Sequence, residues 1–172
     1  MRMYINYCCA ILLGILVLSA CNNGDGNDDT NGQSSKIHVY GVTSTRSLGE
    51  DDSKLVFSGD NIEWFNPETR EIKFKGIEPS SAVFPVYSKI AFKIDGKTLF
   101  FASSFVEDSY SQIFNDLVIY YSIEKGKYYL DDCYPSISEV RNQEVVKQNI
   151  INREISWKEF VNTLNSEKKI KK

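Results

Sequence analysis

The sequence has a single histidine, His38, among its 172 residues. A Ser–His–acid triad or a reactive Cys–His pair would have to use this one side chain. His38 falls in a strand-like run, so we expect a solvent-facing strand residue with no catalytic role. One histidine and one cysteine in the body of the chain also leave the usual zinc ligand set incomplete, and we expect no metal site.

Cysteine and glycine are also sparse. Cys8, Cys9 and Cys21 lie near the N-terminus, which leaves Cys133 without a disulfide partner in the body of the chain. We expect Cys133 to be a small buried apolar side chain in a fold stabilised by its core. The ten glycines are scattered and form no G-x-x-x-x-G-K phosphate-binding loop. We therefore expect no cofactor.

The chain lacks an excess of basic residues as well. It has 20 Lys and Arg against 23 Asp and Glu, a formal net charge of −3. Proteins that bind nucleic acid usually present a clustered basic surface, so nucleic acid is not an expected partner. With 42% hydrophobic and 25% charged residues the composition is that of a globular protein, and the length predicts one domain.

Residues 1–20 have the features of an export signal. Arg2 supplies a positive charge, and the uninterrupted apolar run 10–18 is short for a membrane crossing. Leu18-Ser19-Ala20-Cys21 resembles the lipobox of bacterial lipoproteins at all four positions. The resemblance implies cleavage before Cys21, a diacylglyceryl group on its thiol and acylation of the new N-terminus. The alternative, an uncleaved signal anchor, is disfavoured because the run is short and ends at a cysteine.

The resemblance also implies a location. Two or three acyl chains, at about 0.8 kcal/mol per buried methylene, would anchor Cys21 stably in a membrane. Asn22 is not the aspartate that retains lipoproteins in the inner membrane of enteric bacteria, so we favour the outer membrane of the cell envelope. Asp25, Asp28 and Asp29 resemble the acidic surface-export signals of some Gram-negative groups, which would extend this to surface exposure.

The sequence predicts three segments. Residues 1–20 are the signal peptide and residues 21–36 are the lipidated cysteine with a polar tether. Residues 37–172 form a single globular domain. The tether holds no apolar residue from Asn22 to Lys36, so it cannot bury surface, and it reaches about 20 Å on average.

The domain begins with short strands separated by turns. Asp95-Gly96 is a favoured two-residue hairpin turn because both positions tolerate positive φ. Hairpins in series with no helix between them predict an antiparallel sheet. The expected strands are 37–40, 55–57 and the pairs 61–65 with 71–75, 89–94 with 97–101, and 117–121 with 127–130.

The last forty or so residues change to a helical pattern. We expect a polar helix over 139–151 and a second helix that Ser156 and Glu159 begin as a capping box, with Ile155 and Phe160 as a hydrophobic staple. An apolar stripe at helical spacing must pack on the sheet, which predicts an α+β fold with one or two C-terminal helices on it. The stripe comprises Trp157, Phe160, Val161 and Leu164.

Carboxylates are the remaining catalytic candidates. Asp131 and Asp132 follow a predicted strand, and Glu63 and Glu107 lie elsewhere in the chain. A glycosidase needs two carboxyl groups roughly 5–10 Å apart, and neighbouring strand residues face opposite ways. We expect solvated surface acids, with a carboxylate-dependent hydrolase of glycan or peptidoglycan as the alternative.

Tyrosines and a tryptophan form the candidate binding patch. Tyrosine combines apolar area with a hydrogen-bonding tip, which suits recognition surfaces. We predict a patch made of Trp64, Tyr110, Tyr128 and Tyr134, although aromatic residues on strands more often belong to the core.

The leading hypothesis is a non-enzymatic envelope lipoprotein that binds a protein or glycan partner. An envelope inhibitor or immunity protein, or a structural role in a larger complex, stays open. The basic residues 168–172 are expected to be a solvated helix end, with contact to anionic lipid as the alternative.

Overall fold

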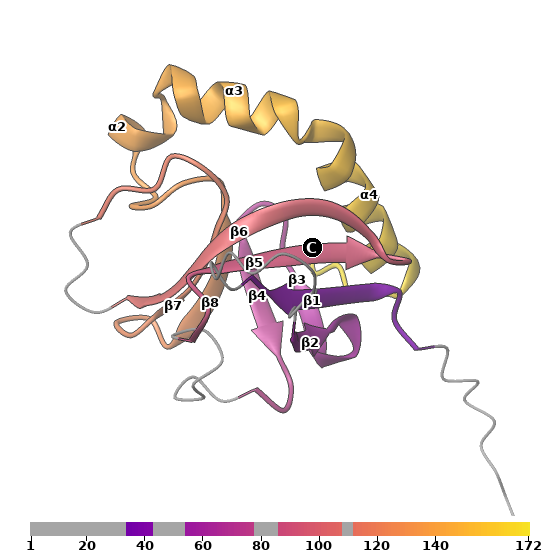
Figure 1. Cartoon of the computed structure of the whole chain (residues 1–172). Coiled ribbons are helices and arrows are strands. Elements are labelled where there is room, and N and C mark those ends of the chain that lie inside the picture. The colour runs from indigo at the N-terminus through magenta and orange to yellow at the C-terminus, as the bar shows by residue number, and fades with distance from the viewer. Residues whose placement is uncertain (1–33, 43–53, 78–85, 108–111) are drawn as a thin grey trace, which may run out of the picture. The chain divides into compact units, whose positions relative to one another are not determined.

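The strands of the domain form one mixed sheet (Figure 1). The computed structural model describes residues 34–42, 54–77, 86–107 and 112–172, so the predicted signal peptide and Cys21 lie outside it. Within these ranges the strand order is β2-β1-β5-β6-β7-β8-β4-β3. The strands are β1 (Ile37–Gly41), β2 (Leu55–Ser58), β3 (Ile62–Phe65), β4 (Glu71–Phe74), β5 (Lys89–Ile94), β6 (Lys97–Glu107), β7 (Val118–Ser122) and β8 (Lys127–Asp131).

The sheet curls nearly into a barrel because its two edge strands are neighbours in the chain. β2 and β3 end the strand order on opposite sides, yet only the 3-10 helix η1 (Gly59–Asn61) joins them. Ser58 and Asn61 form a capping box around this short helix. A Cβ atom at Gly59 would overlap the Ser35 hydroxyl, so the close approach there requires glycine.

The three predicted hairpins are confirmed. β5 pairs with β6 across Asp95-Gly96, whose φ values of 48° and 81° lie in the left-handed region. β3 pairs with β4, and β7 pairs with β8, in antiparallel register. Local turn residues therefore predicted these pairings correctly.

The prediction of a wholly antiparallel sheet was wrong at one place. β6 and β7 are parallel, in register from Ser103 beside Val118 to Glu107 beside Ser122. Parallel neighbours cannot be joined by a tight turn, and the sequence between Glu107 and Val118 has no two-residue turn signal. The fold is α+β with a mostly antiparallel sheet.

The C-terminal helices begin and end differently from the prediction. The helix expected over 139–151 is two helices, α2 (Ser138–Arg141) and α3 (Glu144–Asn152). α4 (Glu154–Ser166) begins before Ser156, so the predicted capping box and staple are wrong, and Ile155 is 84% exposed. Arg153 alone separates α3 from α4, and its ion pairs described below set this boundary in place of a local cap.

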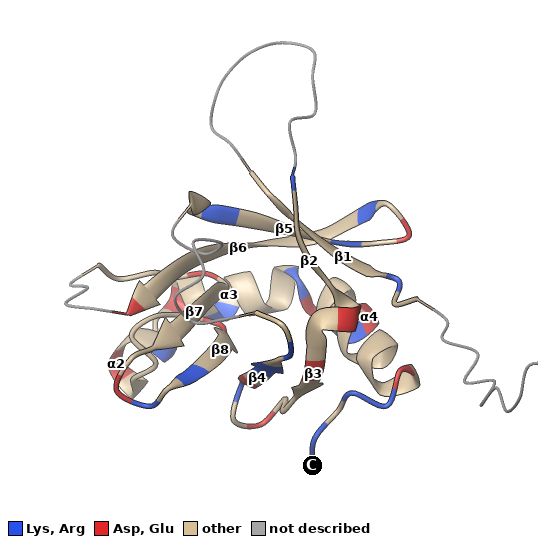
Figure 2. Ribbon diagram, turned by 90° about the horizontal axis from the view of Figure 1, so that it is seen from below, with Lys and Arg blue, Asp and Glu red and all other residues tan. Residues whose placement is uncertain are grey.

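The predicted apolar stripe does pack on the sheet. Phe160 and Leu164 are fully buried, and Trp157 and Val161 pack beside them in the same core cluster. The Phe160 ring lies 5.5 Å from that of Phe100. Figure 2 shows α4 on the concave side of the sheet, with β1 and β5 above it. Burying each large apolar side chain contributes roughly 1.5–3 kcal/mol, so α4 is part of the main core.

The C-terminal residues also differ from the solvated end that was expected. Ile170 forms a parallel bridge with Phe65 of β3, and the Lys169 ammonium donates to the Gly59 carbonyl at 2.8 Å. Glu167 accepts a hydrogen bond from the Ser35 hydroxyl at 2.8 Å, and Ser35 is only 3% exposed. The last residues of the predicted tether are therefore fastened to the C-terminal end of the domain. No helix in the described ranges is long and apolar enough to span a membrane.

Candidate functional site

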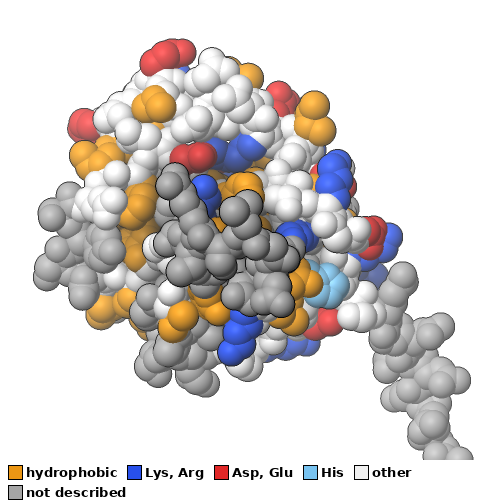
Figure 3. Space-filling model, in the orientation of Figure 1, with side chains coloured by type: hydrophobic (Ala, Val, Ile, Leu, Met, Phe, Trp, Pro, Cys, Tyr) orange, Lys and Arg blue, Asp and Glu red, His pale blue; other side chains and the backbone are white. Residues whose placement is uncertain are grey.

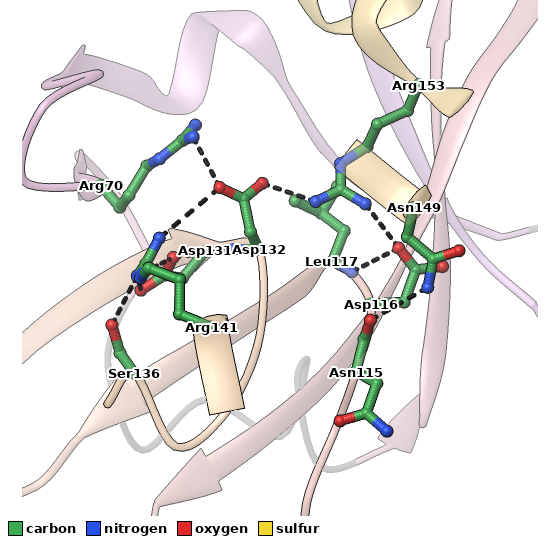
Figure 4. A network of polar contacts seen from close by, with 10 residues as sticks. All are labelled: Arg70, Asn115, Asp116, Leu117, Asp131, Asp132, Ser136, Arg141, Asn149 and Arg153. Carbon is green, nitrogen blue, oxygen red and sulfur yellow. Dashed lines mark hydrogen bonds and ion pairs between the residues drawn. The ribbon is translucent and has the colours of Figure 1, made fainter. Parts of the chain in front are cut away.

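A network of ion pairs lies where β8 ends (Figure 4). Asp131 and Asp132 were expected to be solvated, but each is only 3% exposed. Their burial is compensated by three arginines from three other segments of the chain, as buried charges require. Arg70 lies in the β3–β4 turn, Arg141 in α2, and Arg153 between α3 and α4.

Asp132 is the centre of this network. Its Oδ1 lies 2.5 Å from Nη2 of Arg153, and its Oδ2 lies 2.6 Å from Nη2 of Arg70. Nη1 of Arg141 is 3.7 Å from the same Oδ2. The carboxylate thus joins a hairpin turn, a strand end and two helical segments.

Asp131 has its own arginine. Nη2 of Arg141 donates to both of its oxygens, at 2.8 and 3.0 Å. Burial alone would lower the pKa of the Arg141 guanidinium, but the Asp131 carboxylate raises it above its ordinary value. All four oxygens of Asp131 and Asp132 therefore accept a charged hydrogen bond.

Arg70 is held in an unusual conformation. Its φ of 62° is left-handed, a region that costs a non-glycine residue roughly 1–2 kcal/mol. Its guanidinium lies 4.6 Å from the centre of the Trp157 ring, and its Nη1 is buried with no hydrogen-bond partner among the described residues. The contacts of Arg70 with Asp132 and Trp157 hold the turn in this shape.

Arg153 connects the buried network to the surface. While its Nη2 bonds Asp132, its Nη1 lies 2.6 Å from Oδ1 of Asp116. The same Oδ1 accepts from the Leu117 amide at 2.8 Å. The Arg153 side chain is 9% exposed, whereas that of Asp116 is 66% exposed. A solvent-accessible carboxylate is thereby held by a buried guanidinium.

Asp116 borders a pocket of about 320 Å³ between β6 and α3, which we call the α3–β6 pocket. Its walls include Phe100, Phe101 and Leu117. In Figure 3 acidic and basic side chains meet hydrophobic ones below the helices on the face shown. The polar residues of the lining are Lys89, Ser103, Asp116, Asn149, Asn152 and Arg153.

A second cluster, which we call the aromatic column, lies across β6, β7 and β8. The rings of Phe105 and Tyr120 stack 5.4 Å apart, and those of Tyr120 and Tyr129 stack at the same distance. Tyr134 donates to Glu107 at 2.9 Å. Burial, aided by Glu107, raises the pKa of Tyr134 to about 12. These side chains mainly bury one another.

The predicted patch residues lie in different surroundings. Tyr128 is 7% exposed and packs in the main core against Phe74, while Tyr134 is 7% exposed in the aromatic column. Trp64 is half-buried, with the Lys171 ammonium 4.0 Å from its ring centre. Tyr110 lies outside the described residues. The structure does not bring the three described residues into one cluster.

The other candidates are placed as follows. His38 is half-buried on β1, with its Nδ1 3.2 Å from the Lys36 carbonyl. Cys133 is fully buried and free, as predicted, and burial raises the pKa of its thiol. Glu63 pairs with Lys73 at 3.0 Å. No group of three potential metal ligands occurs within the described ranges.

Sequence reasoning missed Asp116, Asn149 and Arg153. The available signal was the scarcity of arginine, since only five of the 20 basic residues are arginines and three of them meet at Asp132. Arginine is the cation that forms buried, multiply bonded ion pairs, so a rare arginine in a lysine-rich chain points to such a site.

No protein-family model, no curated protein and no solved structure matches this chain.

Proposed function

We propose that this chain is a bacterial cell-envelope lipoprotein whose domain binds a ligand without transforming it. Acyl chains on Cys21 would hold it in the membrane, with the outer membrane favoured. The observation that carries the binding function is the α3–β6 pocket, in which Arg153 bonds Oδ1 of Asp116 while the Asp116 side chain is 66% exposed. A pocket with a few fixed polar groups is the usual form of a small-molecule site.

The engaged carboxylates favour binding over hydrolysis. A general acid needs a carboxyl group that can carry a proton, usually in an apolar setting. Asp131 and Asp132 instead bond arginines through every oxygen. Within the described ranges, Asp116 is the only carboxylate among the residues that line the α3–β6 pocket, whereas a glycosidase places two across the bond to be broken.

The hydrogen bonds of Ser35 shorten the tether that we propose. Because Ser35 bonds Glu167 and Asp60, it belongs to the domain, and only the twelve residues 22–33 would separate Cys21 from the first described residue, Ser34. Twelve residues span at most about 40 Å when fully extended. The binding domain would then work close to the membrane surface.

Metabolic labelling with palmitate tests the anchoring. The wild-type protein is expected to incorporate label and to fractionate with membranes, and Cys21→Ser to lose both. Wild-type protein that never takes up palmitate would refute the lipoprotein assignment.

The binding function is tested separately by affinity purification of the acylated protein from its native membrane. We expect a ligand to be recovered with the wild-type protein and to be lost from an Asp116→Ala variant, which would show that it binds in the pocket. Turnover of labelled peptidoglycan that Asp116→Asn abolishes would establish the hydrolase in its place.

A further inference from the structure

The charges around the α3–β6 pocket favour an uncharged ligand. Arg153 bonds Asp132 with one nitrogen and Asp116 with another, so two carboxylates neutralise its charge. The other two charged residues of the lining, Lys89 and Asp116, have opposite signs, so an anion or a cation would meet one attractive and one repulsive group. The lining therefore has no excess of either charge sign to select an ion over a neutral molecule.

The pocket lining has two acceptor atoms and one donor group that are not used in hydrogen bonds within the described residues. Asn149 uses its amide nitrogen on the Asn115 carbonyl at 2.9 Å, which leaves its Oδ1. Asn152 uses its Oδ1 to accept from Gln148 at 2.9 Å, which leaves its Nδ2. Oδ2 of Asp116 is the third such atom. None of the three bonds another described residue, and together they match hydroxyl groups, which both donate and accept.

Phe101 adds an apolar surface beside these polar atoms. Its side chain lines the pocket and is 45% exposed, an unusual exposure for a phenylalanine. The Lys89 ammonium lies 4.8 Å from the ring centre. Lys89 is itself exposed, so a ligand can displace it from the ring at little cost. An aromatic ring next to planar hydrogen-bonding groups suits a molecule that has both an apolar face and a rim of hydroxyls.

We infer that the α3–β6 pocket binds a neutral sugar residue of a glycan. In this arrangement Asp116, Asn149 and Asn152 bond the sugar hydroxyls, and Phe101 contacts the C–H face of the ring. The inference depends on the proposed binding function and names its ligand class. The volume of about 320 Å³ is at the lower end for small-molecule sites, which fits one or two sugar rings.

Preorganisation supports this assignment. Arg153 is 9% exposed and bonded to Asp132, so Asp116 is held in position before any ligand arrives. A fixed side chain loses less conformational entropy on binding than a mobile one.

The test uses the full-length protein in detergent, applied to an array of neutral and acidic glycans. The best neutral oligosaccharide is then titrated by calorimetry against the wild type, Phe101→Ala and Asn152→Ala. Ile151→Ala and Asn165→Ala serve as matched controls, because both residues are exposed and neither lines the pocket. Thermal melting of each variant checks that it is folded.

We expect the wild type to retain at least one neutral glycan. Phe101→Ala and Asn152→Ala should each weaken binding roughly tenfold, and the controls should change it less than about twofold. Retention of no neutral glycan, of acidic glycans only, or of neutral glycans equally by all variants would overturn the inference.

The outcome separates this inference from the proposed function. If the protein takes up palmitate and a protein partner is recovered that occupies the pocket, the proposed binding lipoprotein is supported and the glycan ligand is refuted. Glycan binding by protein that takes up no palmitate would remove the membrane anchor and keep the sugar site.

Discussion

Asp132 and Asp116 bond the same guanidinium, that of Arg153, yet their surroundings are opposite. The Asp132 side chain is 4% exposed and has three arginines within 3.7 Å. The Asp116 side chain is 66% exposed and has one arginine partner within the described ranges. The comparison indicates that one carboxylate holds the fold together and that the other is presented to the outside.

The physical reason lies in solvation. A buried carboxylate must be compensated by the protein, so its loss leaves uncompensated arginines in a medium that solvates them poorly. An exposed carboxylate keeps its water, and its ion pair contributes little to stability. Arg153 can therefore serve both roles at once, as a structural partner on one side and as a positioning group on the other.

The largest effect is expected for Asp132. Asp132→Ala should lower the free energy of unfolding by about 3–5 kcal/mol, because Arg70 and Arg153 lose their buried counterion. Urea unfolding measures this. A loss below about 1 kcal/mol would show that water replaces the carboxylate and that the network is not structural.

A pH titration tests the burial of tyrosine in the aromatic column. Burial raises the pKa of Tyr134 from 10.0 to about 12. Because the folded state keeps the phenol proton to higher pH than the unfolded state, this contribution to stability is complete below pH 10 and is lost as the pH rises toward 12.

Tyr134→Phe is therefore expected to reduce the loss of stability above pH 10, as followed by urea unfolding across that range. Part of the decrease in the free energy of unfolding with pH should remain, since burial also raises the pKa of Tyr120. If the free energy of unfolding of Tyr134→Phe falls with pH as steeply as that of the wild type, the raised pKa of Tyr134 is contradicted.

The turn at Arg70 gives a smaller, matched comparison. Arg70→Ala and Arg70→Gly both remove the ion pair to Asp132, but only glycine adopts a φ of 62° without strain. We expect Arg70→Gly to be more stable than Arg70→Ala by about 1 kcal/mol. Chemical denaturation of the two proteins side by side measures the difference, and equal stabilities would mean that the turn relaxes once the guanidinium is gone.

Asp116 should show the smallest effect on stability. Asp116→Asn is expected to change the free energy of unfolding by less than about 1 kcal/mol, since the pair with Arg153 is open to solvent on one side. Thermal or urea unfolding checks this, with Asp132→Asn as the control that should be clearly destabilised. Equal losses in the two variants would remove the distinction between the carboxylates.

Much of the domain could be predicted from short stretches of sequence. The Asp95-Gly96 turn, the alternation of strand residues and the stripe that ends at Leu164 are local signals, and each produced the predicted element. Predictions about the environment of single side chains failed more often. Ser156 has the residue type of a helix cap but lies inside α4. The ion pairs of Arg153 with Asp116 and Asp132 place the break between α3 and α4 at Arg153 instead.

The candidate site could not be predicted from local sequence patterns. Asp116 precedes β7, Arg153 follows α3, and Phe101 lies on β6, so only the three-dimensional arrangement brings them to one pocket. The sequence by itself determined the hairpins, the α+β class and the burial of Cys133, since turn residues and apolar spacing act over a few positions. The tertiary structure alone decided the parallel pairing of β6 with β7, the burial of Asp131 and Asp132 and the exposure of Asp116. Charges are compensated by whichever groups lie near them in space, and no local pattern specifies those neighbours.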